Sequence, residues 1–340
     1  MIKEKDELLM QDMERTESLM RECRLCPRNC GVNRMAGERG VCGMTAEIAA
    51  ARAALHMWEE PCISGTEGSG AIFFSGCSMG CCFCQNREIA AGRQGNAVNV
   101  EQLADIFLKL QGQNANNINL VTAGHFLPQT VAALHLAKRR GLTIPVVYNS
   151  SGYEKPEMLQ LLEGLADIYL PDFKYMDPVL AKQYSRAEDY PRRVKQALAE
   201  MVRQAGKLEF DDRGIMKKGV IVRHLLLPGH VADSKKVVEY LYRTYGNQIN
   251  ISLMNQYTPM PAMAGDPLLS RKVTVREYGR LVDYALSLGV EQGFIQEGKT
   301  AEESFIPPFD GSGILDEIGI QRERCGDKDI AERKIQREWN

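Results

Sequence analysis

Three cysteines in the first third of the chain have the spacing of cluster ligands. Cys77, Cys81 and Cys84 form the pattern C-x3-C-x2-C, and the aromatic Phe83 stands directly before the last of them. A four-iron cluster normally takes four protein thiolates, so three leave one iron without a protein ligand. The pattern therefore predicts an iron–sulfur cluster whose open iron binds a substrate or a cofactor.

A second group of four cysteines precedes the first. Cys23, Cys26, Cys30 and Cys42 have the spacing C-x2-C-x3-C-x11-C, and a glycine follows two of them. Four soft ligands can close a structural zinc site or hold a four-iron cluster. Spacing does not decide between zinc and iron–sulfur, and four reduced thiols in a glycine-rich loop are the plainer alternative.

The composition is that of an ordinary globular protein. The chain has 340 residues, of which 44% are hydrophobic and 25% charged, and its formal net charge is −2. This balance gives no indication of nucleic-acid or anionic-membrane binding. The first twenty residues lack the apolar core of a secretory signal, and no apolar run approaches a membrane span of about 18 residues. Clustered cysteines without an export signal indicate metal sites rather than disulfides, and we expect a cytoplasmic protein.

From residue 71 onward, short β-rich runs alternate with helical runs. We expect strands over residues 71–75, 118–122, 144–149, 167–171, 220–227 and 249–254. We expect helices at about 99–111, 129–140, 156–164, 190–205, 233–245 and 274–289. Such alternation, with nearly continuous apolar strands, predicts an α/β fold in which helices cover a parallel sheet. Six units fit an open, partial (β/α)6 barrel, although a doubly wound sheet has the same pattern.

The expected organisation has three parts. An N-terminal helix and the cysteine-rich, metal-binding extension occupy residues 1–62, the partial barrel occupies 63–310, and a charged tail occupies 311–340.

Polar and glycine residues stand at the carboxyl ends of all six predicted strands, where parallel β/α folds collect their chemistry. Asp172 and Lys174 are two residues apart and share one face of a strand. Arg223 points into the barrel if its neighbours point outward. The strand-end candidates for contact with a bound molecule are Gly124, His125, Asn149, Ser150, Ser151, Asp172, Lys174 and Arg223, and Asn255-Gln256-Tyr257 forms a polar rim after the last strand.

These motifs resemble those of the radical S-adenosylmethionine (SAM) enzymes over roughly residues 70–260. The loop C-x3-C-x-aromatic-C after a first strand is similar to their cluster loop. Asn149-Ser-Ser-Gly152, Asp172-Phe-Lys174 and Arg223–Gly229 resemble strand-end motifs of the pyruvate formate-lyase activating enzymes. The cysteine-rich segment ahead of the barrel resembles an uncharacterised branch of activase-like proteins.

The resemblance implies a [4Fe-4S] cluster held by Cys77, Cys81 and Cys84, with SAM chelated to the open iron. One electron from a flavodoxin- or ferredoxin-type donor would cleave SAM to methionine and a 5′-deoxyadenosyl radical, which abstracts a hydrogen atom. Phe83 would pack against the cluster or the adenine; a core aromatic is the alternative. The strand-end candidates would contact SAM, with Lys174 and Arg223 near its carboxylate.

The sequence departs from the family at the second strand. The usual motif there is Gly-Gly-Glu, and this chain has Ala123-Gly124-His125. Gly124 would still permit a close approach of the SAM amino end. A protonated histidine cannot accept a hydrogen bond from an ammonium group, so a substrate-side or proton-handling role for His125 is the alternative to SAM binding.

Three functions follow from these observations. The first is activation of a partner enzyme by placing a glycyl radical on it. The second keeps SAM cleavage but acts on a small molecule, a peptide or RNA. The third is a non-catalytic iron–sulfur or zinc protein. The string from Gly293 to Thr300 has the spacing of a phosphate loop, but it lacks the strand–loop–helix context and we do not expect nucleotide binding there.

Overall fold

The computed structural model describes residues 17–296 and 307–315 of the chain. Most of the expected N-terminal helix, most of the charged tail with Cys325, and the Gly298-Lys299-Thr300 string lie outside the described residues.

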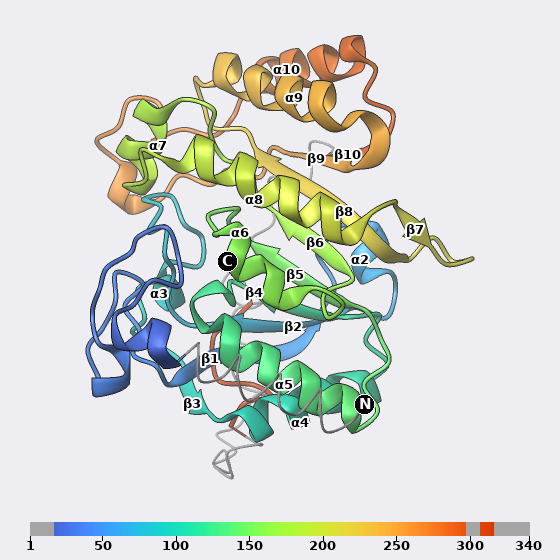
Figure 1. Cartoon of the computed structure of the whole chain (residues 1–340). Coiled ribbons are helices and arrows are strands. Elements are labelled where there is room, and N and C mark those ends of the chain that lie inside the picture. The colour runs from blue at the N-terminus through green and yellow to red at the C-terminus, as the bar shows by residue number, and fades with distance from the viewer. Residues whose placement is uncertain (1–16, 297–306, 316–340) are drawn as a thin grey trace, which may run out of the picture.

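An open, largely parallel sheet forms the centre of the molecule (Figure 1). Its strands follow the order β10-β9-β8-β6-β5-β4-β2-β1-β3. Neighbouring strands are parallel from β2 to β10, and β1 and β3 extend the sheet antiparallel beyond β2. The parallel strands are β2 (Ser69–Phe74), β4 (Ile118–Val121), β5 (Val146–Ser150), β6 (Ile168–Pro171), β8 (Met216–Leu225), β9 (Asn250–Met254) and β10 (Gly293–Ile295).

The predicted α/β fold is confirmed, and the sheet does not close into a full barrel. Each of the six expected strands is present within a few residues of its expected bounds. The strands β2, β4, β5 and β6 are buried at every position, as expected for strands covered on both faces. The strands that the sequence did not predict are β1 (Ile48–His56), β3 (Asn96–Val98), β7 (Glu209–Phe210) and β10.

Helices cover the outer face of the sheet. In Figure 1, α4 and α5 lie together beside β2 and β4, and α9 and α10 lie together near β9. The six expected helices are present, although the one expected at 156–164 divides into α6 and a 3-10 turn. The helices are α2 (Pro61–Ser64), α3 (Arg87–Ala90), α4 (Val100–Gly112), α5 (Leu127–Arg139), α6 (Pro156–Leu159), α7 (Pro178–Ser185), α8 (Tyr190–Ala205), α9 (Val231–Tyr245) and α10 (Val275–Leu288).

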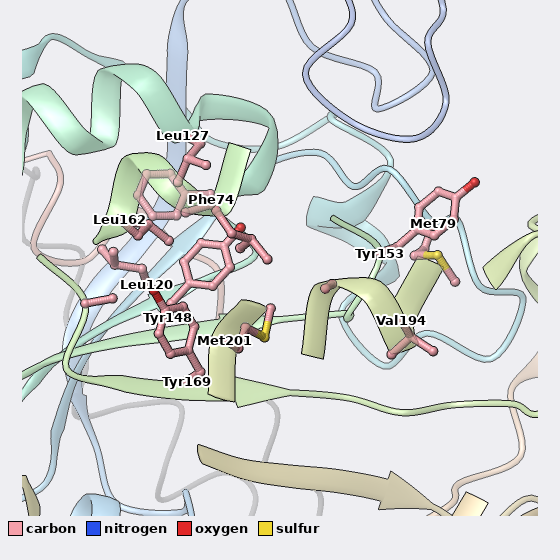
Figure 2. Packing of buried hydrophobic residues seen from close by; sticks show 14 of the residues in the cluster. Phe74, Met79, Leu120, Leu127, Tyr148, Tyr153, Leu162, Tyr169, Val194 and Met201 are labelled. Atoms are coloured by element: carbon pink, nitrogen blue, oxygen red, sulfur yellow. The ribbon is translucent and has the colours of Figure 1, made fainter. Parts of the chain in front are cut away.

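Alternate residues of the strands build two apolar layers. Figure 2 shows Tyr148 of β5 on the helix side, near Leu120 and Tyr169. The rings of Tyr148 and Tyr169 meet edge to face, with centroids 6.1 Å apart. On the inner side, Val147 and Ile168 pack with Cys62 and Ile63 of α2. The segment before β2 therefore fills part of the barrel interior.

Strand β1 lies within residues 1–62, the part that the sequence assigned to the N-terminal extension. It pairs with β2 along most of its length. The boundary at residues 62 and 63 stays a prediction.

No helix in the described ranges has the length and apolar character needed to cross a bilayer.

Candidate active site at the carboxyl ends of the strands

The loop between β2 and α3 carries the three cysteines of the C-x3-C-x2-C pattern. Cys77 donates its backbone N–H to the carbonyl oxygen of Cys42 at 3.1 Å. The Sγ of Cys81 accepts a hydrogen bond from Ser185 Oγ at 2.9 Å. A charge on Cys77 or Cys81 would raise the pKa of Cys84, which shows that the three thiols are near one another.

Two thiols of the cysteine loop, those of Cys81 and Cys84, are protonated in the absence of a metal, and a metal can bind them by displacing these protons. Burial raises the pKa of Cys81 to about 11 and that of Cys84 to about 12, while Lys174 opposes both shifts. Both thiols are therefore neutral near pH 7 until a metal replaces the proton. Soft sulfur donors of this kind ligate iron–sulfur clusters.

Within residues 17–296 and 307–315, no group of three or more His, Cys, Asp or Glu side chains is spaced as the ligands of a single metal ion. The fit of these three cysteines to a cluster rests on the chemistry of their sulfur donors.

Asp172 and Lys174 form an ion pair at the end of β6. Lys174 Nζ lies 2.6 Å from Asp172 Oδ2, and Arg223 Nε donates to Asp172 Oδ1 at 3.0 Å. Burial alone would raise the pKa of Asp172, but the charges of Lys174 and Arg223 outweigh it and lower that pKa below its usual value. One half-buried carboxylate thus holds two cations together beside the cysteine loop.

Arg223 connects this pair to the barrel interior. Its guanidinium donates to Asn149 Oδ1 at 2.6 Å and to Glu59 Oε2 at 3.2 Å. Its neighbour His224 points the other way, with Nδ1 hydrogen-bonded to the carbonyl oxygen of Phe173 at 2.7 Å. The inward orientation predicted for Arg223 is the one that the structure has.

Two cavities share Arg223 in their walls. The smaller one has a volume of about 220 Å³ and is bordered by Cys81, Phe83, Cys84, Asp172 and Lys174. The larger has a volume of about 650 Å³ and extends into the barrel, where Glu59, Glu60 and Asn149 border it. The shared wall consists of Gln85, Asn86, Arg223, Met254 and Gln256. A molecule in the smaller cavity would therefore adjoin one in the larger.

Phe83, which is part of the cysteine loop, packs against the aromatic side chains of Tyr175 and Tyr257. Its ring meets those of Tyr175 and Tyr257 edge to face, with centroids 6.4 and 6.2 Å away. It is buried, and it also borders the smaller cavity. Both expected roles, core aromatic and cofactor contact, are compatible with this position.

Four of the expected cofactor contacts do not border either cavity: Gly124, His125, Ser150 and Ser151. His125 Nε2 lies 2.6 Å from the carbonyl oxygen of Ser75, and burial lowers the pKa of His125 to about 3. The ring is therefore neutral, and Nε2 must carry the hydrogen, because a carbonyl oxygen only accepts. This hydrogen bond connects the segment that follows β4 to Ser75, which precedes the cysteine loop.

Ser150 is also engaged by the protein itself. Its Oγ donates to Glu154 Oε2 at 3.1 Å and accepts the N–H of Gly152 at 3.2 Å. Gly152 has a φ of +74°, and a Cβ there would lie 2.5 Å from the carbonyl oxygen of Asp172. Only glycine fits, so the β5 end can pack closely against the β6 end.

The structure adds three largely buried carboxyl groups that the sequence analysis did not identify: Glu59, Glu60 and Glu154. Glu59 and Glu60 belong to the segment before α2, outside the expected barrel. They do not follow any of the six predicted strands, so the search at the strand ends did not include them. Glu154 follows Gly152 by two residues. Its Oε1 lies 3.7 Å from the point that a Cβ on Gly124 would occupy. A carboxyl group therefore lies beside the second-strand motif, although residue 125 is a histidine.

Glu154 makes stability depend on pH in an unusual direction. Burial raises its pKa from 4.5 to about 8, and the nearby Asp172 adds to the rise while Ser150 and Lys174 oppose it. Between these values the folded state holds a proton that the unfolded state has released, so the free energy of unfolding should fall as pH rises from 5 to 8.

The expected slope from this group is at most about 1.4 kcal/mol per pH unit. Glu154→Gln is neutral at every pH and should remove this contribution, which urea unfolding at several pH values will measure. An unchanged slope in the variant would show that Glu154 is ionised in the folded protein.

The comparison with known protein families agrees with this geometry. The radical SAM superfamily profile matches residues 71–241, which include the cysteine loop and the ends of β4, β5, β6 and β8. The chain belongs to the radical SAM superfamily. Members of this superfamily use a [4Fe-4S] cluster and SAM, and they generally take electrons from a flavodoxin or ferredoxin.

The proteins similar to this chain include one curated relative and two solved structures. The uncharacterised protein MJ0674 of Methanocaldococcus jannaschii is 28% identical over 289 residues, which span 83% of this chain and 79% of that protein. A radical SAM methyltransferase from Sphaerobacter thermophilus aligns with a TM-score of 0.47 and 14% identity, over 69% of this chain and 68% of that one. Streptococcus suis SuiB, bound to its precursor peptide SuiA, aligns with a TM-score of 0.43 and 12% identity, over 66% of this chain and 48% of that one.

Proposed function

We propose that this chain is an enzyme that cleaves SAM reductively and uses the resulting radical to take a hydrogen atom from a substrate. The observation that carries the proposal is the smaller cavity, where Cys81, Cys84, Asp172 and Lys174 border one space. With the cluster bound, one electron converts SAM to methionine and a 5′-deoxyadenosyl radical, which becomes 5′-deoxyadenosine when it takes the hydrogen atom.

The residues around the cavity have separate tasks in this proposal. Cys77, Cys81 and Cys84 hold the cluster. Lys174 and Arg223 present positive charge to the SAM carboxylate, and Asp172 fixes both cations. Asn149, which borders the larger cavity and receives a hydrogen bond from Arg223, is available to the SAM ribose.

We assign to Glu154 the task that a glutamate at position 125 would have, namely accepting hydrogen bonds from the SAM ammonium group. Its position beside Gly124 supports this assignment. Binding of an ammonium group would favour the ionised form of Glu154 and compensate its burial.

Glu154→Gln should therefore weaken SAM binding by about 10- to 100-fold, the value of one charge-assisted hydrogen bond. Equilibrium binding of SAM to the anaerobic enzyme measures this. Glu157→Gln, an exposed glutamate in the first turn of α6, is the matched control and should bind SAM normally. Equal affinities in the two variants would remove Glu154 from the SAM site.

The central proposal is tested with the unmodified protein. Anaerobic reconstitution with iron and sulfide, followed by SAM and dithionite, should release 5′-deoxyadenosine and methionine in equal amounts. A reconstituted protein that carries a cluster but releases neither product would contradict the proposal.

The substrate has two candidates. The motifs that resemble the activating enzymes support a glycine of a partner protein, on which the enzyme would leave a glycyl radical. The larger cavity of about 650 Å³, bordered by Glu59 and Glu60, supports instead a small molecule or one residue of a peptide, and RNA remains a further alternative. Electron paramagnetic resonance after incubation with a glycyl radical enzyme from the same host separates them, because only the first predicts the doublet signal of a glycyl radical.

A further inference from the structure

The four cysteines of the N-terminal segment come together in a compact loop, here called the cysteine knot (residues 23–43). Backbone hydrogen bonds fold it back on itself, from Cys23 N to Val32 O at 2.9 Å and from Gly31 N to Cys23 O at 3.1 Å. Charges on Cys23, Cys30 and Cys42 would each raise the pKa of Cys26, and burial raises it further, to about 12. The four sulfurs therefore share one region, and none of them forms a disulfide.

Gly40 leaves space between two of these sulfurs. A Cβ at this position would lie 3.3 Å from Cys30 Sγ, a tight contact, and 3.4 Å from Cys42 Sγ, at the edge of ordinary van der Waals contact. The backbone of Gly40 does not have the left-handed conformation that would by itself require glycine. The absence of a side chain here keeps the space beside Cys30 and Cys42 open.

A buried cation lies against the same group. Arg34 is only 1% exposed, and its guanidinium lies 3.9 Å from Cys23 Sγ. It donates to the carbonyl oxygens of Thr45 and His125, and it has no carboxylate partner in the described part of the chain. Neutral thiols would leave this buried charge uncompensated, which is costly, whereas thiolates on a metal centre would compensate it.

We propose that Cys23, Cys26, Cys30 and Cys42 ligate a second [4Fe-4S] cluster, next to the SAM-binding one. The donors suit this centre, since four cysteine thiolates complete the ligand set of a four-iron cluster. Its core with four thiolates is an anion, which the buried positive charge of Arg34 would stabilise.

The knot is attached directly to the loop of the first cluster, which favours a redox centre over a structural zinc. Cys42 O accepts the N–H of Cys77, so a ligand residue of one centre is hydrogen-bonded to a ligand residue of the other. Arg28 donates to the carbonyl oxygens of Ser78 and Met79 at 2.7 and 3.0 Å. A Cβ on Gly76 would lie 2.7 Å from Cys42 O, so the two loops approach as closely as glycine permits.

These contacts give the second cluster a role as an electron relay. A flavodoxin- or ferredoxin-type donor would reduce it by one electron, and it would be reoxidised when that electron passes to the SAM-binding cluster. This role rests on the proposed function, but the existence of the site does not.

The test removes the three cysteines of the SAM-binding cluster and measures the iron and sulfide that the protein still binds. In the triple variant Cys77→Ala/Cys81→Ala/Cys84→Ala, reconstituted anaerobically, we expect about four iron atoms and four sulfides per chain, with the visible absorption of an iron–sulfur cluster. Adding Cys26→Ala should bring the iron to background. Adding Cys62→Ala instead should leave it unchanged, because Cys62 is a buried cysteine on the inner face of the sheet.

Each alternative result overturns the proposal. Zinc in place of iron would make the knot a structural site, and a folded triple variant without metal would mean that the four thiols stay reduced. Circular dichroism of each variant shows whether it is folded. Since the triple variant cannot bind the first cluster, its iron content is independent of whether the enzyme cleaves SAM.

A second test changes Arg34 in the triple variant and measures the reduction potential of the remaining cluster. Arg34→Gln removes the positive charge beside the cluster, so the reduction potential of the remaining cluster in the triple variant should shift to more negative values. Arg39→Gln, an exposed arginine of the same knot, should leave the potential unchanged. Equal potentials for both variants would place the cluster away from Arg34 and contradict the assigned ligands.

Discussion

Replacing Cys77 with alanine should reduce the release of 5′-deoxyadenosine to the level measured without enzyme. Cys77 is one of the three cysteines of the C-x3-C-x2-C pattern, and no other cysteine of the loop stands in its position of that pattern. A cluster with two protein ligands should be lost or unable to bind SAM productively. The measurement is 5′-deoxyadenosine by liquid chromatography after reaction with SAM and dithionite.

Cys82→Ala is the matched control for this prediction. Cys82 lies between Cys81 and Phe83 in the same loop, but it stands outside the C-x3-C-x2-C pattern. Its backbone N–H is bonded to the carbonyl oxygen of Tyr184 at 2.9 Å, a contact that alanine retains. The control should release 5′-deoxyadenosine at close to the rate of the unmodified protein. Normal release by Cys77→Ala would show that the cluster ligands have been assigned wrongly.

The cysteine loop and the strand ends could be predicted from the sequence because both are local signals. The spacing from Cys77 to Cys84 is contained in one loop, and each buried parallel strand is a continuous apolar run followed by polar residues. The direction of Arg223 also followed from the alternation along one strand, since its neighbour His224 is buried against Phe173 on the other side. The partial barrel needed the resemblance as well, because a doubly wound sheet has the same pattern.

The carboxyl groups could not be predicted because they depend on pairings between distant segments. Glu59 meets Arg223 only because β1 pairs with β2 and brings the following segment into the barrel. Strand β1 is rich in alanine, which has low strand propensity, and its sequence alone gives a weak signal. Glu154 reaches the second-strand motif from the third strand, a contact between neighbouring strands that no spacing rule reports.

Replacing Arg223 with methionine should destabilise the protein by about 3–5 kcal/mol, the usual cost of removing one partner of a buried ion pair. Methionine has a similar length but no charge. Asp172 would keep Lys174, while Glu59 would lose its only charged partner within the described residues. The free energy of unfolding, measured by urea denaturation, should fall by this amount at pH 8.

The loss should be smaller at pH 5 than at pH 8. Burial raises the pKa of Glu59, whereas the charge of Arg223 lowers it. Without Arg223, the effect of burial on this pKa is no longer offset by that charge. The pKa of Glu59 then rises further, and at pH 5 this carboxyl group can take up a proton and become neutral. Glu59→Gln in the Arg223→Met background should therefore recover much of the stability at pH 8 and little at pH 5.

Arg213→Met is the matched control for this last prediction. Arg213 also pairs with carboxylates, Asp211 and Glu67, but its side chain is 54% exposed. Pairs in water contribute little, so this change should cost less than about 1 kcal/mol. If Arg223→Met cost no more than Arg213→Met, the network of Arg223 with Glu59 and Asp172 would be open to solvent, and its role in holding positive charge beside the smaller cavity would have to be abandoned.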